Sequence, residues 1–554
     1  MGMTKTLDIV NIAEFLPILA HSKPEDPAIY CSQRKAGQYK IYTYSQLNQE
    51  SDWIAGGLLL YGFKPKSRIV LMVKPSLEFF ALVFGMFKAG IVPVIIDPGL
   101  EKAKLKHAID QVDPEGFIGI PLAQITRILL GWGKKSIKRV ITVGPRLAWG
   151  GTTLATIRTL GQSPLAPTLP ITKVHDIAAV LFTSGSTGTP KGAVYTHGNF
   201  LAQVQYLKES FNIQPGEIDV PTFPLFALFD PALEMVSVIP YMDFSKPAKA
   251  NPEKIIRLVH DFNATNLFAS PALLDNLCRY AINKDKKLPS LKRAISAGAP
   301  VHPKIVVQFR KLIKKESDLY TAYGATEALP VSIVSGNEIL QDTQIKTDAG
   351  WGICVGKLVP PLEVKIIRIC EHPLKTLSEE LELKLGEIGE IIVCGAQVTS
   401  SYFGMADETT YAKIPLINDK RLYHRMGDVG YFDDQGRLWY CGRKSHRVVT
   451  IDKIYFTEVC EGIFNQHPAI YRTALVGVTI KGQIHPVICV ELEADKKRQF
   501  SSVLSDLLNL AKKFPQTNQI CHFLHHKKLP VDIRHNAKIN REKVALWADK
   551  ELNG

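Results

Sequence analysis

The stretch Leu181–Gly192 constrains this chain more than any other segment. It reads LFTSGSTGTPKG and includes the end of the apolar run 177–182, which predicts a buried strand. Pro190 and the two interior glycines disfavour a regular element, so we expect a loop that leaves the end of that strand. Glycines let a backbone approach a ligand closely, and consecutive N–H groups form a concave anion site. With its hydroxyl groups and Lys191, the stretch predicts a polyphosphate site.

A Ser/Gly/Thr cluster on its own is more often a flexible surface loop. The stretch also fails the Walker A pattern, because Lys191 is followed by Gly192. Over its full length it resembles the phosphate loop of the adenylate-forming superfamily, which includes acyl-CoA synthetases, peptide-synthetase adenylation domains and luciferases. The resemblance implies ATP and Mg²⁺ as cofactors and a catalytic role for Thr187. The residues that it places at the nucleotide are Thr183, Ser184, Gly185, Ser186, Thr187, Gly188 and Lys191.

The segment YTAYGATE, residues 320–327, is a second match to this family. Alone, a strand end followed by a glycine turn and an acid is a weak signal, and a capping Glu is the simpler interpretation. By resemblance to the family's YGxTE motif, Tyr323 and Gly324 flank the adenine. Thr326 then contacts the α-phosphate, and Glu327 is a catalytic residue that binds Mg²⁺. A carboxylate is the kind of hard oxygen ligand that Mg²⁺ prefers.

Two more matches lie on either side of that motif. The turn SAGAP resembles the family's adenine-side turn, which implies that Gly298, Ala299 and Pro300 lie at the nucleotide. Asp428, in the segment GDVG, matches the acid that binds the ribose hydroxyls, and a carboxylate suits that role because it accepts several hydrogen bonds. Arg443 resembles an arginine that contacts the nucleotide near the domain boundary.

The segment LPVDIRHNAKINR, residues 529–541, resembles the family's C-terminal PxxxxGKIxR motif. Ala537 stands where Gly is usual, and the spacer after Pro530 is longer by two residues. Lys538 takes the position of the catalytic lysine that reaches the carboxylate and the α-phosphate during adenylation. An ammonium there offsets the charge that develops in the transition state. A solvated surface lysine is the simpler interpretation of a single Lys in a Lys-rich chain.

Strand-like and helix-like segments alternate along the N-terminal part. A strand over 68–73, a helix from Leu77 and a strand over 92–96 follow in the order that is typical of a parallel sheet. Residues 101–143 repeat this scheme. Thr43 is the expected N-cap of a preceding helix.

The pattern and the resemblance together predict an α/β protein. We expect residues 1–443 to form a large N-terminal AMP-binding region of parallel-type sheets with a β subdomain. Residues 444–554 should form a small, mobile C-terminal α/β cap. The chain of 554 residues is long enough for such an arrangement.

Composition narrows the class of partner. The net charge of +14 is compatible with nucleic acid, a membrane surface or anionic substrates, but no nucleic-acid-binding motif is present, so no nucleic-acid partner is expected. Nine cysteines without a CxxC pair indicate free thiols in a reducing compartment rather than disulfides or a zinc site. The N-terminal residues are too charged for a signal peptide, so we expect a cytoplasmic protein, with location at the inner membrane surface as an alternative.

The segment 222–238 is rich in aromatic and aliphatic residues. It is either plain core or the lining of an apolar pocket for an acyl chain, to which Phe226 and Phe229 would belong. Asp230 is the exception in this segment. A buried acid is costly unless it is paired, so Asp230 is either functional in that pocket or hydrogen-bonded at a turn before Pro231.

The segment 122–132 is apolar on one side and is followed by several basic residues. A Trp-bearing basic segment of this kind can lie on a membrane surface. We favour the commoner alternative, a core helix with a solvated lysine edge. A lipid-like substrate would favour the membrane interpretation.

Several departures weaken the case for a CoA thioester as the product. Ser445 stands at a hinge position where Asp or Lys is usual, and Phe456 stands where Pro is common. Ile451 replaces a Gly that CoA ligases commonly place beside the pantetheine tunnel, where a bulkier side chain would clash. Ala227 replaces the His of the frequent PLFH sequence. The segments FPLFALFDPALEM, GRKSHRVVT, CEGIFNQHP and PVDIRHNAKINREK most resemble the β-lactone synthetases of bacterial long-chain olefin biosynthesis.

In that subgroup the β-hydroxyl of the adenylated acid attacks its own acyl group, which gives a β-lactone and AMP without CoA. We therefore expect activation of a long-chain fatty acid, best a β-hydroxy acid that closes to a β-lactone. A fatty acyl-CoA ligase and an adenylation enzyme that loads a separate carrier protein are alternatives, so the use of CoA stays open. A non-catalytic nucleotide-binding scaffold is a fourth hypothesis, against which the intact motifs argue. Partner enzymes of the same pathway and a peripheral membrane contact also stay open.

Overall fold

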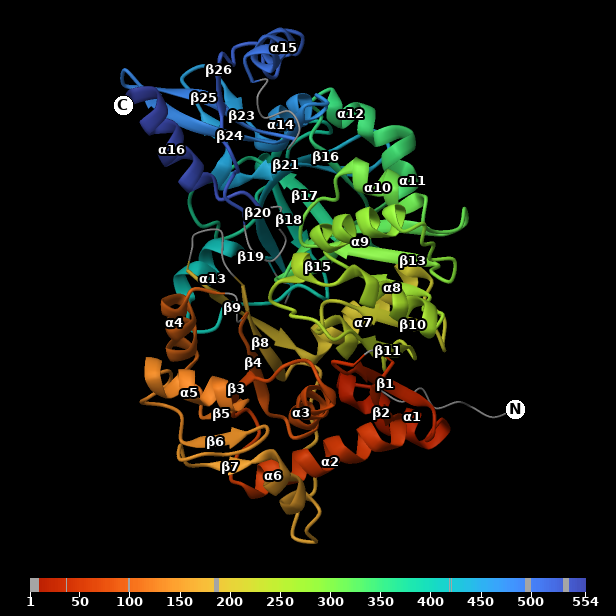
Figure 1. The fold of residues 1–554 in the computed structure, drawn as a ribbon. Helices are drawn as coiled ribbons and strands as arrows, with labels where there is room; N and C mark the ends of the chain where they lie inside the picture. Colours follow the sequence, from red (N-terminus) through yellow and green to blue (C-terminus); the bar gives the residue numbers. More distant parts are fainter. Residues whose placement is uncertain are drawn as a thin grey trace, which may run out of the picture.

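The computed structural model describes residues 9–35, 37–97, 100–183, 189–417, 419, 421–493, 500–531 and 538–554. Within these residues the strands form two large sheets and two small ones, and helices pack on and between them (Figure 1). The fold is α/β, as predicted. No described helix is both long and apolar enough to cross a membrane.

The first large sheet has seven strands in the order β7-β6-β5-β3-β4-β8-β9. Its strands are β3 (Arg68–Met72), β4 (Val92–Ile95), β5 (Gly116–Gly119), β6 (Arg139–Thr142), β7 (Thr152–Thr153), β8 (Ile177–Thr183) and β9 (Lys191–Thr196). All neighbours pair in parallel except β8 and β9, which form an antiparallel pair. The predicted parallel succession of β3, a helix and β4 is confirmed.

The second large sheet has a parallel half and an antiparallel half, with the order β17-β18-β20-β21-β16-β15-β14-β13-β12-β10-β11-β1-β2 and β19 paired to β20. The parallel half and its edge contain β1 (Pro27–Ser32), β2 (Tyr39–Thr43), β10 (Ile218–Pro221), β11 (Val236–Ile239), β12 (Asn266–Phe268), β13 (Arg293–Ala297) and β14 (Asp318–Ala325). The antiparallel half contains β15 (Ala328–Ser335), β16 (Ile353–Leu358), β17 (Glu363–Ile367), β18 (Gly389–Cys394), β19 (Lys413–Pro415), β20 (Leu422–Phe432) and β21 (Arg437–Arg443). The two halves meet where β14 turns into β15.

The helices of the N-terminal part pack against these two sheets. They are α1 (Phe15–Ser22), α2 (Tyr44–Leu60), α3 (Leu77–Lys88), α4 (Lys102–Val112), α5 (Pro121–Leu130), α6 (Leu154–Gly161), α7 (His197–Phe211), α8 (Pro252–Asp261), α9 (Pro271–Asn283), α10 (Pro303–Arg310), α11 (Gly336–Glu338), α12 (Gln344–Asp348) and α13 (Ala406–Ala412). The short helical segments are η1 (Ile12–Glu14), η2 (Phe226–Leu228), η3 (Pro247–Lys249), η4 (Ile339–Thr343), η5 (Glu379–Leu381) and η6 (Lys444–His446).

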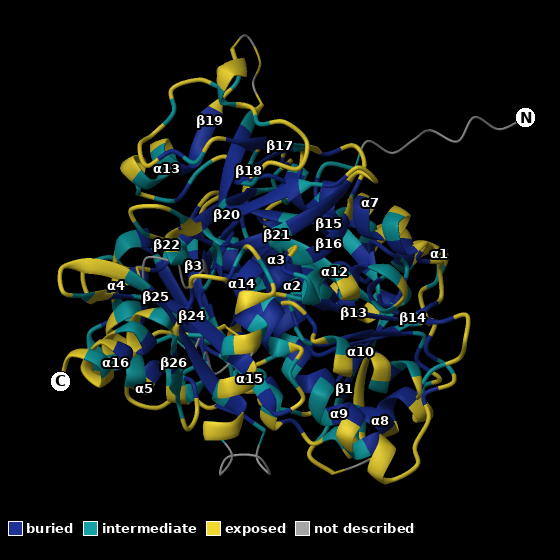
Figure 2. Cartoon of the chain, turned by 90° about the horizontal axis from the view of Figure 1, so that it is seen from above, coloured by how far each residue is buried: buried dark blue, intermediate teal, exposed yellow. Residues whose placement is uncertain are grey.

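Two local features explain how these helices sit. Thr43 caps α2 as expected, because its side chain accepts from the backbone N–H of Gln46 and Gln46 bonds back to Thr43 N. Helix α3 is apolar on nearly all sides, and its residues share one hydrophobic core with residues of α7 and of both large sheets. Figure 2 shows the strands of this interior as buried and the outer helices as partly exposed.

The elements after η6 form the upper part of the molecule in Figure 1. They are β22 (Val448–Val449), β23 (Ile454–Tyr455), α14 (Thr457–Asn465), β24 (Ile470–Ile480), β25 (Gln483–Leu492), α15 (Phe500–Lys512), β26 (His522–His525) and α16 (Arg541–Asn553). The strands β24, β25 and β26 make a separate sheet, while β22 and β23 form a hairpin.

Helix α5 differs from the favoured expectation of a core helix. Within α5 only Gln124 is buried, and four large apolar side chains are exposed: Leu122, Ile125, Ile128 and Leu129. Trp132, which the sequence suggested for a surface role, is buried instead. Amphipathic spacing identifies the two sides of a helix but does not state which side faces the protein.

Candidate active site

The phosphate-loop motif connects two antiparallel strands. Strand β8 ends at Thr183 and β9 begins at Lys191, so the motif closes a hairpin at one edge of the first sheet. Ser184, Gly185, Ser186, Thr187 and Gly188 lie outside the described residues. The Lys191 ammonium lies over the Tyr402 ring, with 5.4 Å between Nζ and the ring centroid.

The sheet register brings Asp428 and Arg443 together. They are direct partners across β20 and β21, and Arg443 Nη1 lies 3.0 Å from Asp428 Oδ1. The Tyr323 hydroxyl, from the end of β14, donates to Asp428 Oδ2 at 2.7 Å. Three residues that the sequence assigned separately to the nucleotide therefore form one group, in which Asp428 is buried.

The pKa of Asp428 depends on its burial and on the neighbouring Arg443 and Tyr323. Burial raises the pKa of its carboxyl, and the nearby charge of Arg443 and the hydrogen bond from Tyr323 oppose that rise. The positive charge of Lys538 also lowers this pKa, so the C-terminal lysine acts electrostatically on the same group.

Lys538 is exposed and lies directly before Ile539. A β-bridge joins Val531 to Ile539, and Asn540 N donates to Pro530 O at 2.8 Å. Two residues after Ile539, Arg541 Nη1 donates to the buried carboxylate of Glu461 at 2.6 Å. These contacts fix the backbone on both sides of the segment that presents Lys538, although Ala537 lies outside the described residues.

Thr326 and Glu327 form the turn between β14 and β15. Glu327 is buried and its Oε1 accepts a hydrogen bond from the Tyr402 hydroxyl at 2.8 Å. The backbone carbonyl of Thr326 accepts from the Tyr195 hydroxyl. The turn therefore holds the candidate Mg²⁺ ligand at the junction of the parallel and antiparallel halves of the sheet.

Sequence reasoning missed two residues beside Glu327. Tyr402 orients the Glu327 carboxylate, and Lys413 is a buried lysine whose Nζ lies 5.9 Å from the Tyr402 ring centroid. Lys413 Nζ donates to the Thr399 carbonyl and, at 3.3 Å, to its hydroxyl. Burial lowers the pKa of Lys413 to about 7, against the raising effect of Glu327. Neither residue stands in a motif close to Glu327 in sequence, so no local pattern indicated them.

The adenine-side residues lie at strand ends of the parallel half. Gly298, Ala299 and Pro300 follow β13 directly, and Gly298 has a φ of +91°, which favours glycine. Gly324 lies within β14, where a Cβ would come within 2.7 Å of Ala328 O. Both glycines therefore keep the backbone compact next to Tyr323.

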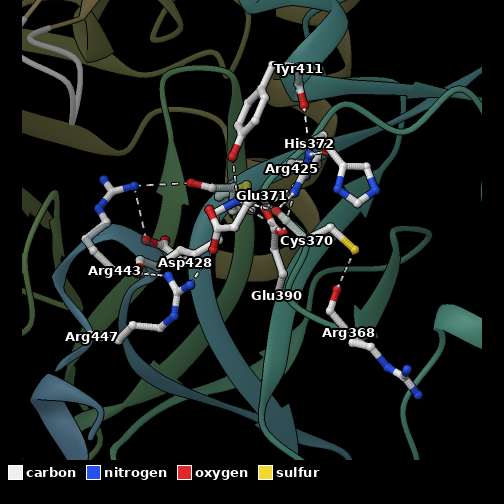
Figure 3. A network of polar contacts seen from close by, with 12 residues as sticks. Arg368, Cys370, Glu371, His372, Glu390, Tyr411, Arg425, Asp428, Arg443 and Arg447 are labelled. Atoms are coloured by element: carbon white, nitrogen blue, oxygen red, sulfur yellow. Dashed lines mark hydrogen bonds and ion pairs between the residues drawn. The ribbon is translucent and has the colours of Figure 1, made fainter. Parts of the chain in front are cut away.

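A buried ionic network fixes the chain just after Arg443 (Figure 3). Arg425 and Glu390 form an ion pair at 2.7 Å, and both are almost fully buried. Lys444 Nζ donates to Cys370 O at 2.9 Å and to the Tyr411 hydroxyl at 2.8 Å. These bonds of Lys444 therefore help to hold the neighbouring Arg443 in its position beside Asp428.

An apolar cavity lies between α7, η2 and the second large sheet. Phe226 and Phe229 line it, as the sequence suggested, and Phe226 stacks on Phe268 with ring centroids 3.9 Å apart. The other lining residues are Gln203, Leu207, Ile295, Ala297, Ala322, Leu329 and Pro330.

Asp230 is not among the residues that line this cavity. Its carboxylate accepts from the Ser237 hydroxyl, and its carbonyl accepts from Met235 N at 2.8 Å. This is the hydrogen-bonded turn that the sequence offered as the alternative. Burial raises the pKa of Asp230 to about 7. The pKa of the neighbouring Asp219 of β10 is also raised, mainly by burial and to a smaller extent by the charge of Asp230.

Asp230→Asn should flatten the pH dependence of stability. A buried carboxyl with a folded pKa of about 7 stays protonated where the unfolded chain ionises, so its contribution is lost as pH rises from about 4 to about 7. One such proton costs up to about 1.4 kcal/mol of unfolding free energy per pH unit. Denaturant titrations across this range should show a smaller fall for the variant than for the wild type. Parallel curves would mean that Asp230 does not titrate in the folded protein.

Comparison with known proteins identifies the family to which this chain belongs. Residues 19–403 match the family described as AMP-binding enzyme. The chain belongs to the AMP-binding enzyme family. The olefin beta-lactone synthetases of Xanthomonas campestris pv. campestris and Stenotrophomonas maltophilia are each 47% identical to it, over 98% of this chain and 98% of their own length. The family match and these two relatives together show that this AMP-binding enzyme is an AMP-forming synthetase.

A solved structure supports the fold of this AMP-binding enzyme. The crystal structure of ATP-bound MatB from Rhodopseudomonas palustris superimposes with a TM-score of 0.78 at 19% identity. The match covers 98% of this chain and all of that chain. The similarity therefore extends through the elements after residue 443 as well as those before it.

Proposed function

We propose that this enzyme activates a long-chain β-hydroxy fatty acid with ATP and closes the resulting acyl-adenylate to a β-lactone. The observation that carries this proposal is the 47% identity, over nearly the whole chain, to two olefin beta-lactone synthetases. The apolar lining of the cavity around Phe226 and Phe229 supports a substrate with an apolar chain. We also propose that the division lies at residues 443 and 444, with 444–554 acting as a cap over the site.

The nucleotide would be held by the buried polar group. Asp428 Oδ1 is buried close to Arg443 and accepts no hydrogen bond of good geometry from the described residues, so a ribose hydroxyl would supply the missing donor. Tyr323 and the turn after β13 would then lie along the adenine. The hairpin between Thr183 and Lys191 would hold the phosphates.

The Mg²⁺ site suits a metal that shares its coordination with phosphates. No three His, Cys, Asp or Glu side chains gather into a metal site within the described ranges. Mg²⁺ commonly uses one or two carboxylates and completes its shell with phosphate oxygens and water. Glu327 would hold it, and the metal would neutralise charge on the departing pyrophosphate. Tyr402 keeps the Glu327 carboxylate in place.

In the first step the substrate carboxylate attacks the α-phosphorus of ATP, and pyrophosphate leaves. Lys538 would offset the negative charge that grows on the α-phosphate and the carboxylate. In the second step the β-hydroxyl oxygen forms a bond to the acyl carbon. The bond from that carbon to the AMP oxygen breaks, and the hydroxyl proton passes to AMP or solvent. The nucleophile is part of the substrate, so proximity supplies much of the rate.

The second candidate is a fatty acyl-CoA ligase, and two positions disfavour it. By resemblance, Ile451 replaces a Gly of CoA ligases, and it lies at the tip between β22 and β23 with 82% of its surface exposed. Ala227, at the position of the frequent His, is buried in η2. Intramolecular attack does not use CoA, so it requires neither the Gly nor the His that CoA ligases commonly have at these two positions.

Mass spectrometry of the products tests the proposal. Purified enzyme would receive ATP, Mg²⁺ and a long-chain β-hydroxy acid, with and without CoA. A dehydrated product and AMP without CoA would support the β-lactone, whereas a thioester formed only with CoA would make the protein a CoA ligase. As a matched control, the same chain length without the hydroxyl should release one burst of pyrophosphate and stop at the adenylate.

Ala322→Leu should lower the maximum chain length of the acids that the enzyme accepts. The larger side chain would occupy the cavity lined by Phe226 and Phe229, so kcat/KM for the longest acids should fall about tenfold while short acids are little affected. ATP–pyrophosphate exchange with acids of increasing length measures this. Val307→Leu on the exposed side of α10 is the control. An equal loss for all chain lengths would place the acyl chain elsewhere.

A further inference from the structure

Helix α5 presents an apolar surface to the outside of the protein. Leu122, Ile125, Ile128 and Leu129 are exposed by 67%, 40%, 52% and 78%. Their spacing places them on one continuous side of the helix. Contiguous exposed apolar side chains of this size indicate an interaction surface.

The inward side of α5 is polar at its centre. Gln124 is buried and its Nε2 donates to Ile141 O at 3.0 Å. Arg127 Nε donates to Gln124 Oε1 at 3.2 Å, and its guanidinium lies 5.6 Å from the centroid of the Phe117 ring. These bonds fix the rotation of the helix, so that its apolar side faces away from the protein.

The charge around this surface is positive. Residues 116–175 contain eight Lys or Arg and no Asp or Glu. Asp110 of α4 accepts from Gly133 N, shortly after α5, and is paired with Lys106. Figure 1 shows α5 at the outer edge of the molecule beside α4. Three exposed lysines follow α5 closely: Lys134, Lys135 and Lys138.

We propose that α5 and the three lysines after it dock on the surface of an anionic lipid membrane. The four apolar side chains would enter the boundary between headgroups and acyl chains, while the ammonium groups would meet anionic headgroups. The apolar stripe would supply affinity for lipid, and the excess of Lys and Arg over acids in residues 116–175 would favour anionic lipid. This inference goes beyond the proposed reaction and does not depend on its product.

Vesicle flotation of the full-length protein tests this docking. Binding to phosphatidylglycerol/phosphatidylcholine vesicles should exceed binding to phosphatidylcholine alone, and it should fall as salt screens the lysines. Leu129→Glu should lower the partition coefficient at least about tenfold, because it places a carboxylate in the apolar stripe. A Lys134→Glu, Lys135→Glu double variant should lose the preference for the anionic vesicles.

Leu546→Glu is the matched control, since Leu546 is an exposed leucine on α16, away from this face. It should bind vesicles as the wild type does, and all variants should keep the melting temperature and pyrophosphate exchange of the wild type. Equal binding to neutral and anionic vesicles, or unchanged binding by Leu129→Glu, would overturn the proposal. The proposal would also be overturned if the protein did not bind vesicles but formed a dimer that Leu129→Glu dissociates. The face would then join two copies of this chain.

Discussion

Replacing Lys538 with Ala should lower the rate of acid-dependent pyrophosphate release by about two to three orders of magnitude. The loss corresponds to one preorganised charge acting on the transition state. Binding of the nucleotide should change much less, because the residues around Asp428 remain in place. ATP–pyrophosphate exchange with a β-hydroxy acid measures the rate, and AMP titration measures the binding.

Lys543→Ala is the matched control for this variant. Lys543 is an exposed lysine in the first turn of α16, close in sequence to Lys538 but outside the motif. It should retain the activity of the wild type. A Lys538→Ala enzyme with more than half of the wild-type exchange rate would exclude the proposed role of Lys538.

Glu327→Gln should produce the second large loss, about two orders of magnitude in the same exchange reaction. Gln keeps the shape of the side chain and can still accept from the Tyr402 hydroxyl, but it removes the negative charge that would hold Mg²⁺. The variant should need a higher Mg²⁺ concentration for half-maximal rate. A titration of the rate with Mg²⁺ measures this shift.

Tyr402→Phe separates charge from orientation. It removes the hydrogen bond from Tyr402 to Glu327 Oε1 and leaves the carboxylate group itself in place, so the rate should fall only about tenfold. If Glu327→Gln and the wild type have the same Mg²⁺ dependence, Glu327 is not the metal ligand. If Tyr402→Phe is as inactive as Glu327→Gln, the hydrogen bond rather than the charge decides activity.

Much of the framework could be predicted because it rests on local patterns. The apolar runs of β3 and β8 and the capping residue Thr43 predicted elements that the structure contains. The segment YTAYGATE predicted a strand and turn, and Thr326 and Glu327 occupy the turn between β14 and β15. These features depend on neighbours in sequence, which a single chain displays directly.

The unpredicted parts depend on partners that are distant in sequence. Tyr402 meets Glu327 across 75 positions, and only the pairing of β20 with β21 brings Asp428 to Arg443. The orientation of α5 is a tertiary property for the same reason. Its buried Gln124 finds an acceptor in β6, so the helix exposes the side that hydrophobicity alone would bury.

If Lys538 has the proposed catalytic role, the anchoring of Lys444 would separate the retention of AMP from a motion of Lys538. The ammonium of Lys444 is tied to Cys370 and Tyr411, so the backbone is held up to the residue before Ser445. A swing of the following segment would therefore pivot beyond this anchor. It would carry Lys538 away from the reacting phosphate while the ribose contacts stayed in place. A reactive adenylate could then remain held by one rigid wall while the opposite wall opens to let a lactone leave.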